Sequence, residues 1–179
     1  KKWHEQVRSE RLYRDSKRPT LNSQWVDGAL DEFFAEIQIT RPEKKPQIDS
    51  LSTVISRPAD LINHPLVRYG NHTASHYVMS SMNTEEQRAE VHNCGNWLEN
   101  TGLPTTLTFA APFGGTADIN PDTFSVLKKT GCSALIMSRK RVNKDVSLDS
   151  TTELPILERY MAPETLSQLI EMSVQLESE

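Results

Sequence analysis

Short apolar runs and helix-like apolar stripes alternate along the chain from about residue 60 onward. Continuous apolar runs bounded by turn residues predict buried strands, whereas apolar positions three or four residues apart predict helices. Strands are predicted over residues 66–70, 105–111, 132–138 and 153–162. Helices are predicted over residues 83–100 and 163–179, with inner faces made of Val91, Cys94, Trp97 and Leu98 and of Leu166, Leu169, Ile170 and Val174.

Capping residues mark the ends of two predicted helices. Asn83 with Glu86 three positions later forms a capping box, in which each side chain accepts a hydrogen bond from the other's backbone amide. A further helix over residues 120–131 begins at Asn120 and ends at Gly131. Strands that alternate with helices in this way predict βαβ units, and therefore an α/β fold with a mostly parallel sheet, here a partial or distorted (β/α) barrel.

The first 50 residues follow a different pattern. A helical stripe is predicted around residues 26–39, with Trp25, Leu30, Phe33, Phe34 and Ile37 on one face. The two prolines within residues 40–47 predict a loop after it. Residues 56–67 predict a short helix or turn. We therefore expect a helical, charged insertion or linker-like segment over residues 1–50 and a β/α domain over residues 51–179.

Composition narrows the classes of protein. The net charge of −4 argues against nucleic acid as the main partner, because phosphate binding needs a concentrated basic face. Residues 1–18 are a local exception, with seven Lys and Arg against three acids, a pattern typical of a solvated face. No apolar run is long enough to span a membrane, and no signal-peptide pattern is visible, which leaves the cytoplasm and the cell envelope open. The two cysteines, Cys94 and Cys132, form no disulfide framework and are expected to be small buried apolar residues.

Two polar loops follow predicted strands directly, at residues 70–76 and 111–118. Functional loops of parallel α/β folds gather where strands end, so both are expected on one edge of the sheet. The first loop, "GNHTASH", places His72 and His76 four residues apart. Such a spacing is common by chance, and His64 in a turn and His92 on an outer helical face are expected to be structural. The strand before the pair and the second loop on the same edge favour a site.

Two imidazoles at this spacing can face one metal ion. Zinc accepts both nitrogens but needs at least one further protein ligand, often a carboxylate. A hydrolytic site would also keep one position for water, whose pKa the ion lowers. Thr73 and Ser75 can hydrogen-bond the loop backbone or a ring nitrogen and so fix the orientation of the rings.

The motifs resemble those of the polysaccharide deacetylases, the NodB-type domains of carbohydrate esterase family 4. "GNHTASH" is similar to the histidine motif of that family, His-Ser/Thr-x-x-His after a strand that ends in Gly-Asn. "TFAAPFGG" at residues 108–115 is similar to the next motif, in a variant seen in many bacterial members. The helix at residues 82–99 and the stretches at residues 126–143 and 157–161 resemble the regions that accompany these motifs. The resemblance spans about residues 60–165.

The resemblance implies a hydrolase that removes N-acetyl or O-acetyl groups from a carbohydrate polymer or oligosaccharide with Zn²⁺ or another divalent metal ion. His72 and His76 would be metal ligands. Pro112, Phe113 and Gly114 would line the substrate site, with the backbone amide of Phe113 as the oxyanion donor. Asp118 is a possible catalytic contributor, although its expected role is that of a solvated polar residue at the approach to the next helix.

Parts of the family pattern have no counterpart in the 179 residues. There is no Asp-Asp pair, Asp27 in "WVDG" lies on a helical pattern, alanines stand where an arginine precedes Pro-Phe, and no histidine follows His92. We expect the metal-ligand Asp to lie upstream of Lys1, with residues 1–50 as an insertion between that motif and the histidines. The alternatives are a catalytically inactive, deacetylase-like carbohydrate-binding module, and an interaction domain that uses residues 1–18 as its contact surface.

Overall fold

The computed structural model describes residues 12–37, 58–139, 141, 143, 153–160, 163 and 165–178. The loop predicted at residues 40–47, the boundary between residues 50 and 51, and the first eleven residues of the basic segment lie outside this part of the chain. Within it, no helix is both long and apolar enough to cross a membrane.

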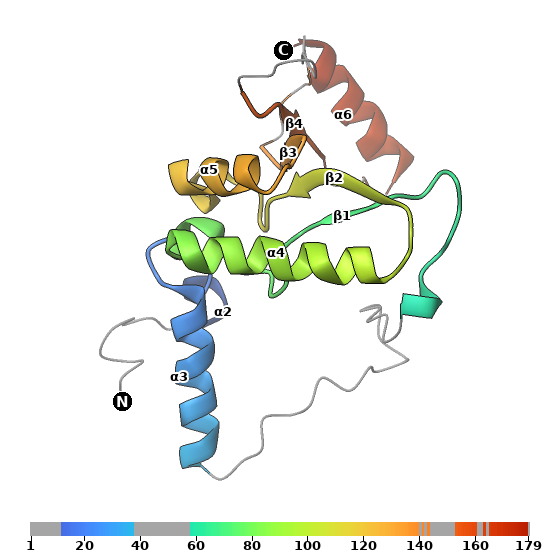
Figure 1. Ribbon diagram of the computed structural model, residues 1–179. Coiled ribbons are helices and arrows are strands. Elements are labelled where there is room, and N and C mark those ends of the chain that lie inside the picture. Colours follow the sequence, from blue (N-terminus) through green and yellow to red (C-terminus); the bar gives the residue numbers. More distant parts are fainter. Residues whose placement is uncertain are drawn as a thin grey trace.

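Four parallel strands form the sheet, in the order β1-β2-β3-β4 (Figure 1). Phe109 of β2 pairs with Leu135 of β3, which in turn pairs with Ile156 of β4. The parallel α/β architecture predicted from the alternating pattern is therefore confirmed, and the described strands form an open sheet that does not close into a barrel. The strands are β1 (Tyr69–Asn71), β2 (Thr105–Ala110), β3 (Ala134–Met137) and β4 (Ile156–Glu158).

Helices α4 (Thr84–Asn100) and α5 (Pro121–Lys129) connect β1 to β2 and β2 to β3. Both begin where the sequence predicts. The Asn83 side chain accepts a hydrogen bond from the Glu86 amide at 3.0 Å, and Glu86 returns the bond to the Asn83 amide at 2.8 Å. The Asn120 side chain caps α5 in the same way, and Gly131 follows its end with a φ of +77°. These caps satisfy amides and carbonyls that a helix leaves unpaired at its ends.

The core lies between the sheet and the two helices. Phe109, Leu135 and Met137 contribute from the strands and are fully buried. Transfer of a side chain of this size out of water stabilises the fold by about 2 kcal/mol. The other members of the core come from α4, α5, the end of β2 and the 3-10 turn η2 (Met79–Ser81): Val91, Val126, Leu127, Ala111, Met79 and Met82.

One polar side chain is buried inside this interface. Gln87 of α4 donates to the Met82 carbonyl at 3.0 Å and accepts from the Thr123 hydroxyl of α5 at 2.7 Å. Because its amide is satisfied on both sides, Gln87 fixes the position of α5 relative to α4 without the cost of an unpaired buried group.

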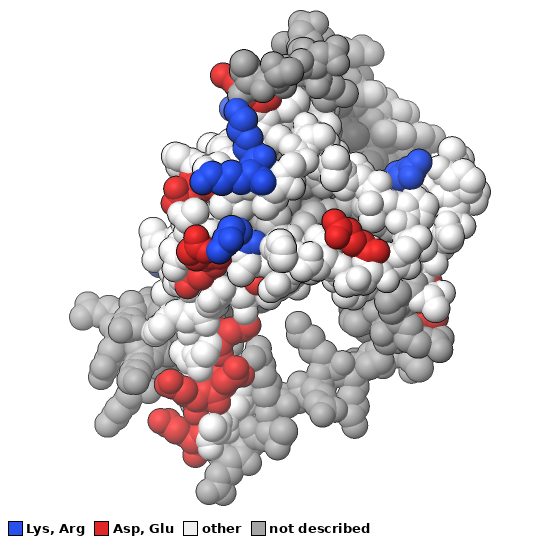
Figure 2. Space-filling view, in the orientation of Figure 1, with Lys and Arg blue, Asp and Glu red and all other residues white. Residues whose placement is uncertain are grey.

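The N-terminal helical segment consists of α2 (Leu12–Asp15) and α3 (Ser23–Glu36), and α3 extends away from the sheet (Figure 1). Hydrogen bonds near the start of α3 join this segment to the β/α part of the chain. The Ser23 hydroxyl lies 3.0 Å from the Ser81 hydroxyl, and the Asn22 amide donates to Glu86 at 3.0 Å. Acidic side chains gather along the visible face of α3 in Figure 2, which suits a helix surrounded by solvent.

Several predicted inner faces were wrong in part. In α3 the buried residues are Ser23 and Val26, whereas Phe33 and Ile37 of the predicted stripe are exposed, because only the start of the helix is covered. Trp97 of α4 is also exposed, although Val91 and Leu98 of the same predicted face are buried. Among the residues of α6 (Leu166–Ser178) whose side chains are described, the predicted stripe is exposed at Leu166, Leu169 and Ile170.

Two smaller expectations also need correction. The strand predicted at residues 66–70 begins only at Tyr69, and Leu66 is exposed in the turn before it. Residues 58–67 form the expected short helix and turn, with η1 at Pro58–Asp60. Cys94 and Cys132 are unpaired, as predicted, but each is half-buried and not part of the core.

Candidate active site

The histidine loop follows β1 and is held by its own short side chains. The Asn71 side chain accepts from the Thr73 amide at 3.0 Å, and the Thr73 hydroxyl accepts from the His76 amide at 2.9 Å. Glu90 of α4 accepts from the Ser75 amide at 2.7 Å. The predicted use of Thr73 as a support for the loop backbone is therefore confirmed. Glu90 also ties the loop to α4.

His72 is oriented by the neighbouring strand. Its Nδ1 lies 2.7 Å from the carbonyl oxygen of Ala110, at the end of β2. A carbonyl can only accept, so Nδ1 carries the proton, and in the neutral ring Nε2 keeps its lone pair. Metal-binding histidines characteristically donate their other N–H to a carbonyl or carboxylate in this way.

His76 lies against both His72 and the second loop. Its ring centroid is 4.8 Å from that of His72 and 4.9 Å from that of Phe113, both with edge-to-face geometry. Partial burial, followed by the positive charge that His72 can carry, lowers the pKa of His76 below its ordinary value. At neutral pH the His76 ring is therefore mostly neutral, the form that binds metals.

The second loop, at residues 111–118, turns sharply at a glycine. Gly114 has a φ of +76°, and a Cβ at this position would lie 2.8 Å from the Ser138 backbone nitrogen. Its carbonyl accepts from the same nitrogen at 2.9 Å, which ties the loop to the end of β3. Pro112 is fully buried. The Phe113 amide donates no hydrogen bond to the part of the chain that the structure describes.

Backbone strain gathers at these two loops. The non-glycine residues with positive φ in the described ranges are Thr73 at 67°, His76 at 59° and Phe113 at 62°. Such conformations cost about 1 to 3 kcal/mol each and persist where the surrounding structure enforces them. All three lie in the two loops that carry the candidate ligands and the candidate oxyanion donor.

Asp118 lies at the far end of the second loop, in the 3-10 turn η3 (Thr116–Asp118). Its carboxylate accepts from the Gly115 amide at 2.7 Å. Burial raises the pKa of Asp118. The observed contact supports the loop, and a direct catalytic part for Asp118 stays a prediction.

Residues from distant parts of the sequence complete the surroundings. Lys17 lies with its Nζ 5.4 Å from the centre of the Phe113 ring, and Arg159 donates through Nη2 to the Ala111 carbonyl at 3.4 Å. Their charges add to the lowering of the pKa of His76. No local motif predicts either residue, because each reaches the site only through the tertiary fold.

Asp27 also approaches the histidine loop. Its carboxylate accepts from the Tyr77 hydroxyl at 2.5 Å, directly after His76. Burial and this hydrogen bond raise the pKa of Tyr77 to about 12, so the phenol keeps its proton. Among the described residues, however, no three His, Cys, Asp or Glu side chains gather closely enough to hold a metal ion. His72 and His76 fit two ligand positions, and a third is not supplied there.

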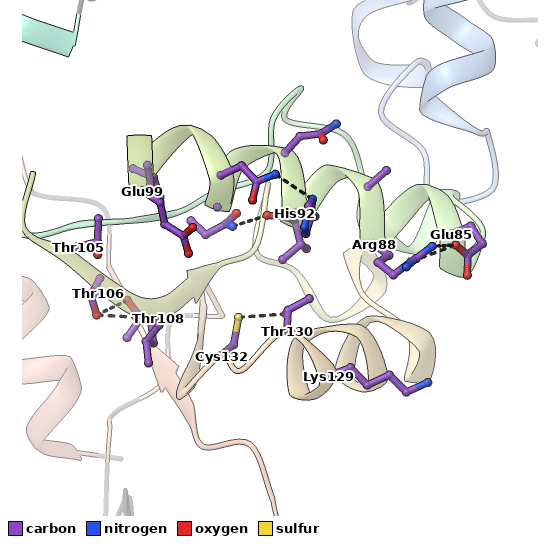
Figure 3. A pocket seen from close by; sticks show the side chains of 18 residues that line it. Glu85, Arg88, His92, Glu99, Thr105, Thr106, Thr108, Lys129, Thr130 and Cys132 are labelled. Atoms are coloured by element: carbon purple, nitrogen blue, oxygen red, sulfur yellow. Dashed lines mark hydrogen bonds and ion pairs between the residues drawn. The ribbon is translucent and has the colours of Figure 1, made fainter. Parts of the chain in front are cut away.

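A separate hollow of about 860 Å³ lies between α4, the first half of β2 and the end of α5 (Figure 3). Its lining includes neither His72 nor His76. Two pairs of its polar side chains bond to each other, Arg88 with Glu85 and Asn96 with His92. Its residues on β2, Thr105 to Thr108, precede the C-terminal end of that strand, whereas chemistry in parallel α/β folds gathers where strands end. We therefore place the candidate active site at the histidine loop.

The fold and the site together define an α/β protein with two loops, a histidine pair and a Pro-Phe-Gly-Gly turn at the ends of adjacent parallel strands. Residues 59–135 match the family model described as polysaccharide deacetylase, and this stretch includes both loops. This stretch of the chain is therefore similar to polysaccharide deacetylase domains. Comparisons with curated proteins and with solved structures found no match.

Proposed function

We propose that this chain is a metal-dependent hydrolase that removes acetyl groups from a carbohydrate polymer or oligosaccharide. The family supports carbohydrate deacetylation in general. The observation that carries the proposal for this chain is the bond from His72 Nδ1 to the Ala110 carbonyl, because it leaves Nε2 available beside His76. This arrangement is the one expected of two metal-binding imidazoles.

His72 and His76 would hold Zn²⁺ or another divalent ion together with a carboxylate that the described residues do not supply. Such an ion polarises a carbonyl and lowers the pKa of water when bound. The bond from Ala110 would keep the His72 ring in place. The mostly neutral His76 would offer a lone pair at neutral pH without first releasing a proton.

Phe113 would act on the acetyl group. When water adds to the acetyl carbonyl, the carbonyl oxygen becomes an oxyanion, and a backbone N–H fixed in a rigid turn can donate to it. The Phe113 amide has no hydrogen bond within the described residues, and Gly114 holds its turn against β3. The C–N or C–O bond then breaks, acetate leaves, and the amine or hydroxyl of the sugar takes up a proton. Pro112, Phe113 and Gly114 would line the sugar site.

The proposal includes the division of the chain into a helical segment over residues 1–50 and a deacetylase-like domain over residues 51–179. The contacts of Lys17 with Phe113 and of Asp27 with Tyr77 support a helical segment that borders the site. A second candidate function is a carbohydrate-binding module without hydrolysis. The absence of an Asp-Asp pair from these 179 residues, and of a third ligand from the described residues, favours this alternative.

The test combines metal binding with acetate release. Wild-type protein, His72→Ala and His92→Ala are titrated with Zn²⁺ by calorimetry and incubated with N-acetylglucosamine oligomers. His92 is exposed on α4, so its variant controls for the loss of any imidazole. We expect His72→Ala to weaken zinc binding by at least about 100-fold and to abolish acetate release, with His92→Ala unchanged. Sugar binding without acetate release or zinc binding would favour the binding module, and acetate release that survives in His72→Ala would refute the hydrolytic site.

A further inference from the structure

Two positively charged side chains meet one turn of an acidic protein. The Lys17 Nζ lies 5.4 Å from the centre of the Phe113 ring, and Arg159 Nη2 lies 3.4 Å from the Ala111 carbonyl oxygen. The two residues come from opposite ends of the described chain, while the whole protein has a net charge of −4. The turn at Ala111–Gly114 is therefore a local concentration of positive charge.

Arg159 differs from the arginine nearest to it on the sheet. Arg139 forms an ion pair with the buried carboxylate of Glu158. Within the described part of the chain, Arg159 has no carboxylate at ion-pair distance, and its guanidinium donates only to Ala111. A guanidinium has five N–H donors in a planar fork that matches a carboxylate. Arg159 thus has the capacity to bind an anion from outside.

The Lys17 ammonium lies over the Phe113 ring of the same turn. The Phe113 ring contacts both the Lys17 ammonium and the His76 ring, whose centre is 4.9 Å away. The cation–π contact holds a flexible side chain near the site at a modest energetic gain. Both cations are close enough to His76 for their charges to act on its ring. A sugar that approached the histidines would therefore meet both cations.

The nearby acidic groups have other contacts. Asp27 accepts from the Tyr77 hydroxyl at 2.5 Å, and Glu90 accepts from the Ser75 amide at 2.7 Å. These carboxylates are used in bonds to the histidine loop, whereas Arg159 contacts the second loop. The positive charge at Ala111–Gly114 is therefore on the side of the site that the Pro-Phe-Gly-Gly turn forms.

We propose that Arg159, together with Lys17, forms a subsite for the carboxylate of an acidic sugar, so that the substrate is an acetylated polysaccharide with uronic-acid-like units. The guanidinium would receive the carboxylate through paired N–H donors, and the ammonium would add attraction at longer range. This inference rests on the proposed deacetylase function for the acetyl group but has its own recognition chemistry.

The test compares two sugars that differ only in charge. One is a tetrasaccharide of alternating glucuronic acid and N-acetylglucosamine, and the other is its neutral carboxyl methyl ester. Calorimetric titration of the wild-type protein at low salt is expected to show about tenfold tighter binding of the acid, as for one charge-assisted pair. The preference should shrink as sodium chloride screens the charges.

Variants assign the preference to residues. Arg159→Gln should lower the preference for the acid to near one, and Lys17→Gln should lower it about threefold. Arg88→Gln is the matched control, because Arg88 pairs with Glu85 on the exposed face of α4. Circular dichroism checks folding, and if Arg159→Gln does not fold, Lys17→Gln and the salt dependence decide the question.

Equal affinity of the wild-type protein for the two sugars, binding of neither, or the same loss in Arg88→Gln as in Arg159→Gln would overturn the subsite. If the two cations serve only the reaction, the wild-type protein will show no binding preference. Replacing either cation will then slow acetate release equally from the acidic and the neutral sugar. The two proposals fail separately. A preference without acetate release contradicts only the deacetylase function, and acetate release without a preference contradicts only the acidic subsite.

Discussion

Gly114 is the residue on which the second loop depends most directly. Its φ of +76° is costly for any other residue, and the space where a Cβ would stand is taken by the backbone of Ser138. Two other glycines separate these effects. Gly131 shares the positive φ but has open space, and Gly28 in α3 has neither constraint. The three positions therefore distinguish the cost of conformation from the cost of contact.

We expect Gly114→Ala to lower the free energy of unfolding by about 3 kcal/mol, and Gly131→Ala by about 1 kcal/mol. Gly28→Ala should be neutral or stabilising by up to about 1 kcal/mol, because alanine favours a helix interior. Urea unfolding followed by circular dichroism measures all three. Equal losses at Gly114 and Gly131 would mean that contact with Ser138 adds no constraint of its own.

At the scale of elements, α3 is attached to the domain by a few polar bonds and little apolar contact. Ser23 and Val26 are its buried residues, while Phe33 and Ile37 are exposed. The Tyr77 hydroxyl donates to Asp27 at 2.5 Å, and Asp27 lies farther along the helix than Ser23 and Val26. Because the attachment is narrow, each bond has a large share in holding the helix.

Tyr77→Phe should release α3 without unfolding the domain. Loss of one hydrogen bond to a carboxylate costs about 1 to 2 kcal/mol. Amide hydrogen exchange in a peptide that covers residues 23–36 should become about tenfold faster, whereas a peptide from α4 should be unchanged. Tyr69→Phe is the control, since the Tyr69 hydroxyl donates to the Ile62 carbonyl outside this interface. Unchanged exchange in α3 would show that the Asp27 bond does not hold the helix.

The sequence predicts element boundaries well where the signal is local. Asn83, Asn120 and Gly131 act on the backbone within a few residues of themselves, so their roles are visible without the fold. The inner faces of α3 and α6 were wrong for the opposite reason. An apolar stripe shows which side of a helix can be buried. How much of that side another element covers depends on the tertiary fold.

At the scale of the whole molecule, a core of buried side chains joins the sheet to α4 and α5. Strand β2 contributes to this core along only part of its length. Phe109 is fully buried, while Leu107, two residues earlier on the same side of the strand, is exposed. The difference arises because the helices cover only the half of β2 that leads to the candidate site. The best-packed part of the molecule therefore supports the two loops.

Phe109→Ala should destabilise the fold by about 3 to 5 kcal/mol, because it removes a large side chain and leaves a cavity. Leu107→Ala on the exposed half should change stability by less than about 0.5 kcal/mol. Thermal unfolding gives both values, and a single transition in each variant would indicate one cooperative unit. A large loss in Leu107→Ala would mean that this half of the strand is covered after all.

The candidate site was predictable only in part. His72, His76 and Phe113 follow strands in short motifs, so their place on one edge of the sheet follows from the parallel topology. Lys17 and Arg159 approach the same turn from positions more than 90 residues before and about 45 residues after Phe113. The spacing of these residues along the chain does not predict their contacts with the turn. The side-chain conformations that bring them there depend on packing.

The bond from His72 to the Ala110 carbonyl also limits how this site can be moved by engineering. It joins an imidazole of one loop to the main chain that leads into the other. Because the acceptor is a backbone atom, the side chain at position 110 can vary, whereas a one-residue slip of β2 against β1 would leave the ring without its partner. A designer who grafts the histidine loop onto another scaffold must therefore graft the end of its neighbouring strand as well.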